Sequence, residues 1–107
     1  LAALTPRDAR VTLDVSGGID RPPLERTPGV VALYQLARVL ALDLGRTLEE
    51  GATGGGSDGN FTAALGIPTL DGLGADGDGA HALHEHVRLD SLAFRAALVG
   101  SLLLHVK

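Results

Sequence analysis

The sequence predicts an α/β protein in which helices and extended segments pack in layers. Apolar residues recur at helical spacing in two long segments, 30–44 and 91–106. Between them lie two segments of strand length, 47–53 and 68–73, and a helical segment of about two turns, 58–65. The resulting order of helix, strand, short helix, strand and helix is typical of a layered α/β domain.

The two long helices carry recognisable start and stop signals. Thr27 followed by Pro28 predicts the cap and first position of the first helix, and Gly45 predicts its end. Asp90 or Ser91 is expected to cap the last helix. Because that helix is apolar on most faces, we expect it to be covered on two sides.

The remaining segments are short or irregular. Residues 11–16 alternate apolar and polar side chains, the pattern of a half-buried strand, and two glycines follow. Residues 19–29 are rich in proline and charge and predict a linker between domains. Residues 74–81 predict a flexible loop of glycine and aspartate, and residues 87–89 a brief extended piece.

Composition excludes several classes of function. With 45% hydrophobic residues, the 107-residue chain is globular, and its net charge of −4 gives no basic surface for nucleic acid. The absence of cysteine excludes disulfides and thiolate metal sites. The most apolar run, 92–106, is interrupted by Arg95 and is too short to span a bilayer. We therefore expect neither a nucleic acid nor a membrane partner.

The chain contains no methionine and opens on Leu1. An initiator methionine is normally removed only when a small residue follows it, so Leu1 is an unusual natural start. The expectation from the sequence is that this chain is a piece of a longer protein.

The stretch GGGSDGNF (54–61) has the spacing G-x-G-x-x-G of a dinucleotide loop. Such a loop needs bare backbone N–H groups and a helix N-terminus aimed at the pyrophosphate. Asp58 instead places a carboxylate where the phosphates would lie. The following helix is also too short for the crossover of a βαβ unit. Both points argue against a nucleotide.

Two other interpretations of the glycine stretch stay open. It forms either a tight strand-to-helix turn that needs glycine for its backbone angles, with Ser57 as the helix cap, or a backbone wall against which a substrate carboxylate or carbonyl lies closely.

A histidine-rich stretch, GAHALHEH (79–86), is the second candidate site. Neutral imidazole is a common metal ligand, but zinc requires about four ligands and the chain holds no second compact cluster. His84 and His86 are expected to face solvent. His81, which has small neighbours and follows a glycine loop, is the best candidate ligand of the three, although an ordinary loop position is the alternative.

Arg21 is a third candidate. A linker arginine is usually only solvated. Held by Pro22 and Pro23, however, its planar guanidinium has the geometry to clamp a carboxylate.

Three stretches together carry a resemblance: GGGSDGNFTAALGIPTLDGLG (54–74), GDGAHALHEHVRLDSLAFRAALVGSLL (77–103) and VTLDVSGGIDRPPLERTPG (11–29). They resemble the C-terminal part of the di-zinc exopeptidase family. That family includes glutamate carboxypeptidases, aminoacylases and succinyl-diaminopimelate desuccinylase, and the nearest branch is the glutamate carboxypeptidase-like one. The Gly-Gly-x-Ser-Asp turn and the late Gly-x-His loop are specific in combination.

The resemblance implies roles for individual residues. His81 matches the histidine of the Gly-x-His loop, a terminal ligand of the second zinc ion. Gly55, Gly56 and Ser57 match the turn that borders the substrate. Arg21 matches the arginine before proline that grips the substrate's free carboxylate.

It also implies a division of the chain. Residues 1–18 would be the last strand of the lid (dimerisation) domain, 19–29 the interdomain linker, and 30–107 the C-terminal part of the zinc catalytic domain. The other ligands of the two zinc ions and the general base would lie upstream, so no catalytic residue is assigned here and the chain alone is expected to be inactive.

The partners implied are a small peptide or acyl-amino acid substrate, the missing N-terminal part of the same protein, and a second copy in a homo-oligomer. The competing hypothesis is a non-catalytic module that uses its glycine loops to hold a small anion or to support assembly.

Overall fold

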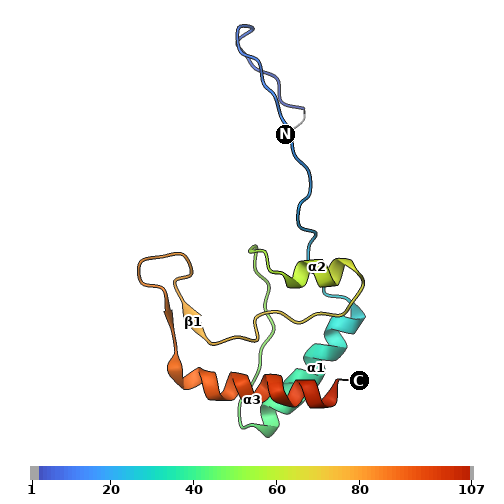
Figure 1. The fold of residues 1–107 in the computed structure, drawn as a ribbon, viewed down its shortest axis with the longest axis vertical. Coiled ribbons are helices and arrows are strands. Elements are labelled where there is room, and N and C mark those ends of the chain that lie inside the picture. Colours follow the sequence, from blue (N-terminus) through green and yellow to red (C-terminus); the bar gives the residue numbers. More distant parts are fainter. Residues whose placement is uncertain (1–2, 107) are drawn as a thin grey trace.

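The computed structural model describes residues 3–106, with two long helices that pack together, a short helix, a two-stranded hairpin and an N-terminal arm (Figure 1). The arm, residues 3–20, extends away from the helices. The elements in chain order are α1 (Pro28–Asp43), α2 (Gly59–Ala64), β1 (Gly77–Asp78), β2 (His86–Val87) and α3 (Leu89–His105).

Helix α1 begins as its sequence predicts. The Thr27 hydroxyl accepts the Val30 backbone N–H at 3.3 Å, and Pro28 occupies the first turn, where no intrahelical partner for an N–H is needed. The last residue of the helix is Asp43, close to the predicted stop.

Helix α3 begins slightly earlier than predicted. Arg88, rather than Asp90 or Ser91, stands at its N-cap. The reason is local: the Ser91 hydroxyl donates to the Arg88 carbonyl at 2.7 Å, so it lies inside the first turn and does not cap the helix.

The core lies where α1 crosses α3. The interior is small, with five buried hydrophobic residues among residues 3–106. Its buried members are Ala37, Leu40, Ala41, Leu98 and Leu102, and the half-buried residues around them are Leu36, Leu48, Leu70, Leu73 and Phe94. Helix α1 covers one side of α3 only. On the other side, Leu103 and Leu104 remain exposed in the described chain, although covering on two sides was expected.

The segments 47–53 and 68–73 have no regular secondary structure and are not strands, contrary to the sequence prediction. Leu48, Leu70 and Leu73 pack against the core, so the apolar signal was real. A strand also needs a neighbour that accepts its backbone hydrogen bonds, and neither segment has one among residues 3–106.

The only sheet in the described residues is the antiparallel pair β1–β2, in which Gly77 pairs with Val87 and Asp78 with His86. Strand β1 lies within the segment 74–81, which was predicted to be a loop, and β2 overlaps the predicted extended piece 87–89 at Val87, whereas Leu89 already belongs to α3. Gly77 is required for this pairing, since a Cβ there would lie 2.1 Å from the His86 carbonyl oxygen.

Residues 11–16 form no strand either, and all of them are exposed. Nothing among residues 3–106 therefore covers the apolar side chains Val11, Leu13 and Val15. Assignment of the segment to a lid-domain sheet stays a prediction. The combination of helices with one small sheet agrees with part of an α/β domain, while its layering also stays a prediction.

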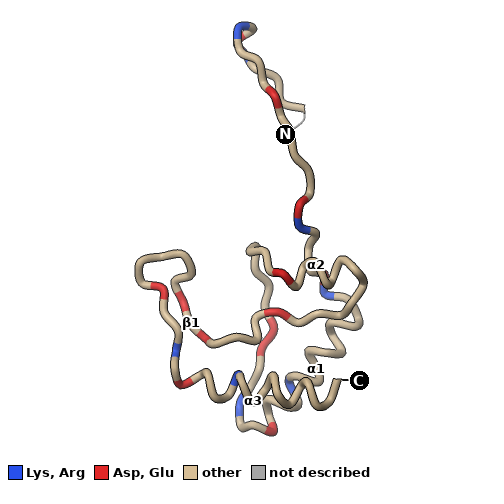
Figure 2. The backbone as a smooth tube through the Cα atoms, viewed as in Figure 1, with Lys and Arg blue, Asp and Glu red and all other residues tan. Residues whose placement is uncertain are grey.

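Acidic and basic residues are interspersed along the chain (Figure 2). Among residues 3–106, no helix is both long and apolar enough to cross a membrane.

Replacement of Leu98 by alanine is expected to lower the free energy of unfolding by about 2–3 kcal/mol, because Leu98 is 0% exposed at the helix crossing and its loss leaves a cavity. Urea denaturation followed by circular dichroism measures the change. The matched control is Leu104→Ala on the same helix, where the side chain is 84% exposed and little change is expected. Equal effects of the two substitutions would contradict the assignment of the core.

Candidate functional site

The chain that enters the glycine turn is held at two points. The Tyr34 hydroxyl on α1 donates to the Leu48 carbonyl at 3.1 Å. The Arg26 guanidinium donates to both carboxylate oxygens of Glu50 at 2.9 Å, which holds the pKa of Glu50 below its ordinary value. These contacts tie the segment 47–53 to α1 and to the linker before α1.

Asn60, in the first turn of α2, joins the linker to the glycine turn. Its side-chain NH₂ donates to the Pro22 carbonyl at 2.7 Å, and its side-chain oxygen accepts the Ser57 backbone N–H at 2.9 Å. Asn60 is itself buried, and the two hydrogen bonds satisfy both the oxygen and the nitrogen of its side-chain amide. The residue next to Pro22 is therefore placed beside the turn.

That residue is Arg21, whose side chain lies against the turn. A Cβ on Gly56 would be 2.9 Å from the Arg21 Cδ, so a side chain at position 56 would require the arginine stem to shift. The centre of the guanidinium lies 4.7 Å from the centroid of the Phe61 ring, and a guanidinium nitrogen lies 3.5 Å from a carboxylate oxygen of Asp58. The structure thus brings together three of the predicted substrate-binding residues, Arg21, Gly56 and Ser57, with Gly55 adjacent in the chain.

Three backbone donors of the turn are already engaged. The Gly55 N–H donates to the Thr53 hydroxyl at 3.3 Å, the Ser57 N–H to Asn60, and the Gly59 N–H to the Ser57 hydroxyl oxygen at 3.1 Å. A phosphate cradle needs such N–H groups unoccupied, and the carboxylate of Asp58 lies at the same turn. The geometry therefore disfavours a nucleotide loop. Asp58 directly precedes α2, but its side chain makes no capping bond. The Ser57 hydroxyl accepts the Gly59 N–H in the first turn, so Ser57 is the residue that caps the helix, as predicted.

His81 lies elsewhere, in the turn region of the β1–β2 hairpin, which is separate from α2 in Figure 1. Its backbone φ is 67°, a left-handed conformation that is uncommon outside glycine, and its side chain is exposed. His84, Glu85 and His86 are also exposed, as expected for both histidines. Within residues 3–106, His81 makes no hydrogen bond through its imidazole.

The residues present do not by themselves fit a zinc centre. No group of three or more histidine, aspartate or glutamate side chains close enough to share an ion occurs in the described chain. His81 is an exposed, unengaged imidazole and suits the part of a single terminal ligand. The site implied by the resemblance would need its other ligands from outside this chain.

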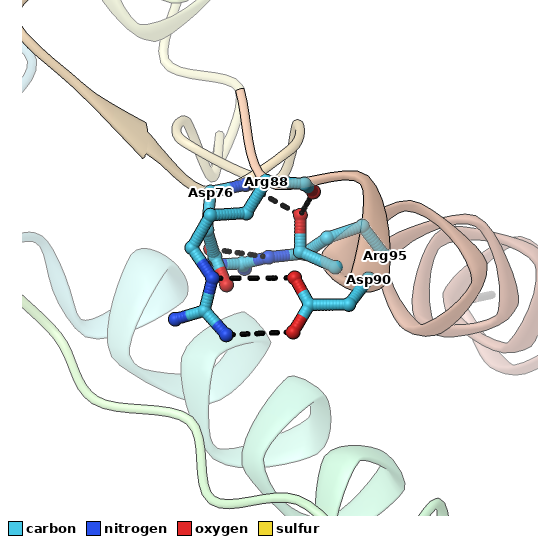
Figure 3. Close-up of polar contacts among 5 residues, drawn as sticks. Asp76, Arg88, Asp90 and Arg95 are labelled. Atoms are coloured by element: carbon cyan, nitrogen blue, oxygen red, sulfur yellow. Dashed lines mark hydrogen bonds and ion pairs between the residues drawn. The ribbon is translucent and has the colours of Figure 1, made fainter. Parts of the chain in front are cut away.

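A polar network fastens the base of the hairpin to α3 (Figure 3). The guanidinium of Arg95 donates to the carboxylate of Asp76 at 3.0 Å, and the Ser91 hydroxyl accepts the Asp76 N–H at 2.9 Å while it donates to the Arg88 carbonyl. The Arg88 N–H donates to the Asp76 carbonyl at 2.7 Å, and its guanidinium pairs with Asp90, which lowers the pKa of Asp90. This network holds both ends of the hairpin that carries His81 against the first turns of α3.

Sequence reasoning missed Asn60 and Phe61. An asparagine near a helix start is typical of local hydrogen bonding, which was a usable signal. Its bond to a carbonyl 38 residues away, and the contact of Phe61 with a linker arginine, depend on the fold and leave no mark on local sequence.

The sequence stretches that build this turn and this hairpin also match a known family. The family model for Peptidase family M20/M25/M40 matches residues 10–105, nearly the whole chain. The chain belongs to this peptidase family. No match was found among curated proteins or among solved structures. Membership in the M20 family indicates a portion of a metallopeptidase or amidohydrolase, and proteins of the M20 family generally bind zinc.

Removal of the Ser91 hydroxyl by Ser91→Ala is expected to loosen the hairpin base. Ser91 is 4% exposed, so the Asp76 N–H would lose its acceptor at a cost of about 1–2 kcal/mol. Amide hydrogen exchange at Asp76 should accelerate about 5- to 30-fold. Ser101→Ala, on the same helix, is the control and should leave the exchange rate at Asp76 unchanged. Unaltered exchange in Ser91→Ala would contradict the network.

The pairing of Arg26 with Glu50 predicts a pH dependence. Because the folded pKa of Glu50 is lowered, the bridge contributes above its ordinary pKa of about 4.5 and is lost as the pH falls through the lower, folded value. A ¹³C NMR titration of the Glu50 carboxyl should show a midpoint below 4.5. In Arg26→Gln the midpoint of the Glu50 titration should return toward that value. The same midpoint in the wild type and in the variant would exclude the bridge.

Proposed function

We propose that this chain contributes the carboxylate-binding side of a zinc-dependent M20 hydrolase of the glutamate carboxypeptidase-like branch. The substrate is a small peptide or an N-acyl-amino acid, and the bond cleaved is the amide next to a free carboxylate. Family membership supports the reaction class, and the arrangement around Arg21 supports the preference for a carboxylate.

The observation that carries the proposal is the approach of Arg21 to the glycine turn. A guanidinium offers paired N–H donors that match the two oxygens of a carboxylate. Here Arg21 comes from the linker, yet its side chain is only 35% exposed and already lies 3.5 Å from a carboxylate, that of Asp58. The place of the Arg21 guanidinium is therefore one that a carboxylate can approach, as that of Asp58 does.

The turn supplies the other contacts. Gly55 presents backbone without a side chain, so a flat amide or carboxylate can lie close to it, and Gly56 leaves room for the Arg21 side chain beside that position. The Ser57 hydroxyl oxygen accepts from the Gly59 N–H, and its O–H remains able to donate to a ligand. These residues bind and orient a substrate; none of them is placed to act as a general base.

The zinc ions belong to the proposal only through His81. We assign His81 as one terminal ligand and assign the remaining ligands and the general base to other parts of the intact protein. When bound, zinc would polarise the scissile carbonyl and activate water. The exposed apolar side of α3 suits coverage by that missing N-terminal part or by a second copy in a homo-oligomer. No nucleic acid or membrane partner is included.

Hydrolysis of N-acyl-amino acids and dipeptides tests the function. The purified 107-residue chain with zinc added should show no turnover, whereas the intact protein should hydrolyse these substrates. In the intact protein, Arg21→Ala should lower kcat/KM about 10- to 150-fold, the effect of losing charge-assisted hydrogen bonds. With a C-terminal amide in place of the carboxylate, the same variant should differ little from the wild type.

The control is Arg10→Ala, because Arg10 is an arginine of the exposed arm that pairs only with Asp8. It should leave kcat/KM unchanged. Turnover by the 107-residue chain alone would contradict the assignment of catalytic groups outside it. Carboxylate binding without hydrolysis by the intact protein would favour the competing function, a small-anion-binding or assembly module.

A further inference from the structure

Arg21 reaches the glycine turn from a linker that has no regular secondary structure. Arginine side chains lose considerable rotamer freedom when held in one place, so a guanidinium in a fixed position requires specific contacts. In this chain three groups supply them: the backbone at Gly56, the carboxylate of Asp58 and the ring of Phe61.

The three contacts differ in kind. Gly56 touches the aliphatic stem, since a Cβ added to this glycine would lie nearest to the Arg21 Cδ. The central guanidinium carbon lies over the ring of Phe61, 4.7 Å from its centroid, a cation–π contact that attracts the charge as a whole. Among residues 3–106, only Asp58 forms an ion pair with the guanidinium: a nitrogen lies 3.5 Å from a carboxylate oxygen of a side chain that is 98% exposed, and no hydrogen bond joins the two side chains. An exposed ion pair of this length is weak and readily exchanged.

We propose that Phe61 is the positioning residue of Arg21 and that Asp58 is the resting counterion that a ligand carboxylate displaces. The ring keeps the guanidinium over the turn while its N–H donors stay available. Asp58 neutralises the charge until a second carboxylate arrives with better geometry. The displacement step rests on the proposed function, whereas the ring contact does not.

The first test is spectroscopic and uses the 107-residue chain. Protons over the face of an aromatic ring are shifted upfield by its ring current. The Arg21 Hε resonance should therefore lie upfield of the other arginines that contact no ring. The shift should vanish in Phe61→Leu and persist in Phe61→Tyr. Phe94→Leu is the matched control: it removes the ring near Arg46 and Arg95 and should not move Arg21.

The second test is an NMR titration with N-acetylglycine, which pairs an amide with a free carboxylate, and with N-acetylglycinamide as the uncharged control. Phe61→Leu should weaken binding of N-acetylglycine about two- to five-fold, and Phe61→Tyr should restore it. Asp58→Asn should strengthen binding by up to about five-fold. Asp43→Asn, at the exposed end of α1, removes the same charge elsewhere and should have little effect.

Several results would overturn the inference. An Arg21 Hε resonance without an upfield shift in the wild type excludes the ring contact, and this measurement needs no variant to fold. Wild-type affinity in Phe61→Leu, checked as folded by circular dichroism, excludes a positioning role. Equal affinities of Asp58→Asn and Asp43→Asn exclude the resting counterion. Failure of the proposed function would give a different result from failure of the ring contact: the intact protein would not hydrolyse the substrates, while the upfield shift of the Arg21 Hε resonance persisted.

Discussion

The candidate site depends on the hydrogen bonds of one buried amide, that of Asn60. This side chain bonds a carbonyl of the linker and an N–H of the glycine turn, and so joins the turn to a linker residue 38 positions before Asn60 in sequence. Without it, the linker has no regular structure to place its side chains, and Arg21 would be one more solvated cation. A buried polar group that satisfies both of its ends is also expensive to replace, because either end left unpaired costs free energy. The position of the guanidinium is therefore a property of α2 as much as of the linker.

The sequence predicted helices better than it predicted strands, and the reason is physical. A helix satisfies its hydrogen bonds within itself, so the cap at Thr27 and the apolar period of α1 were sufficient. A strand depends on a neighbour. Segments 47–53 and 68–73 have the apolar side chains to pack on the core but no partner strand for their backbone among the described residues, and the arm at residues 11–16 lacks one as well.

The site was predictable in its parts and not in its assembly. Arg21, the glycines and His81 were singled out from residue type and motif, and the structure brings the first two together without placing a metal group around the third in the described chain. Phe61 carried no local signal, because a phenylalanine on a short helix is ordinarily core. Its contact with Arg21 follows from where the linker passes, which is information held in tertiary structure alone.

The left-handed backbone at His81 and the imidazole of its side chain place separate requirements on this position, one on the shape of the loop and one on its chemistry. Asparagine tolerates this conformation better than most residues, and glycine adopts it without steric cost. A lineage that exchanged the imidazole for either residue would lose the proposed ligand and keep the hairpin. Loss of the proposed metal ligand would therefore change the fold little. A relative without metal-dependent activity would be recognised from the residue type at position 81 and not from the shape of the hairpin.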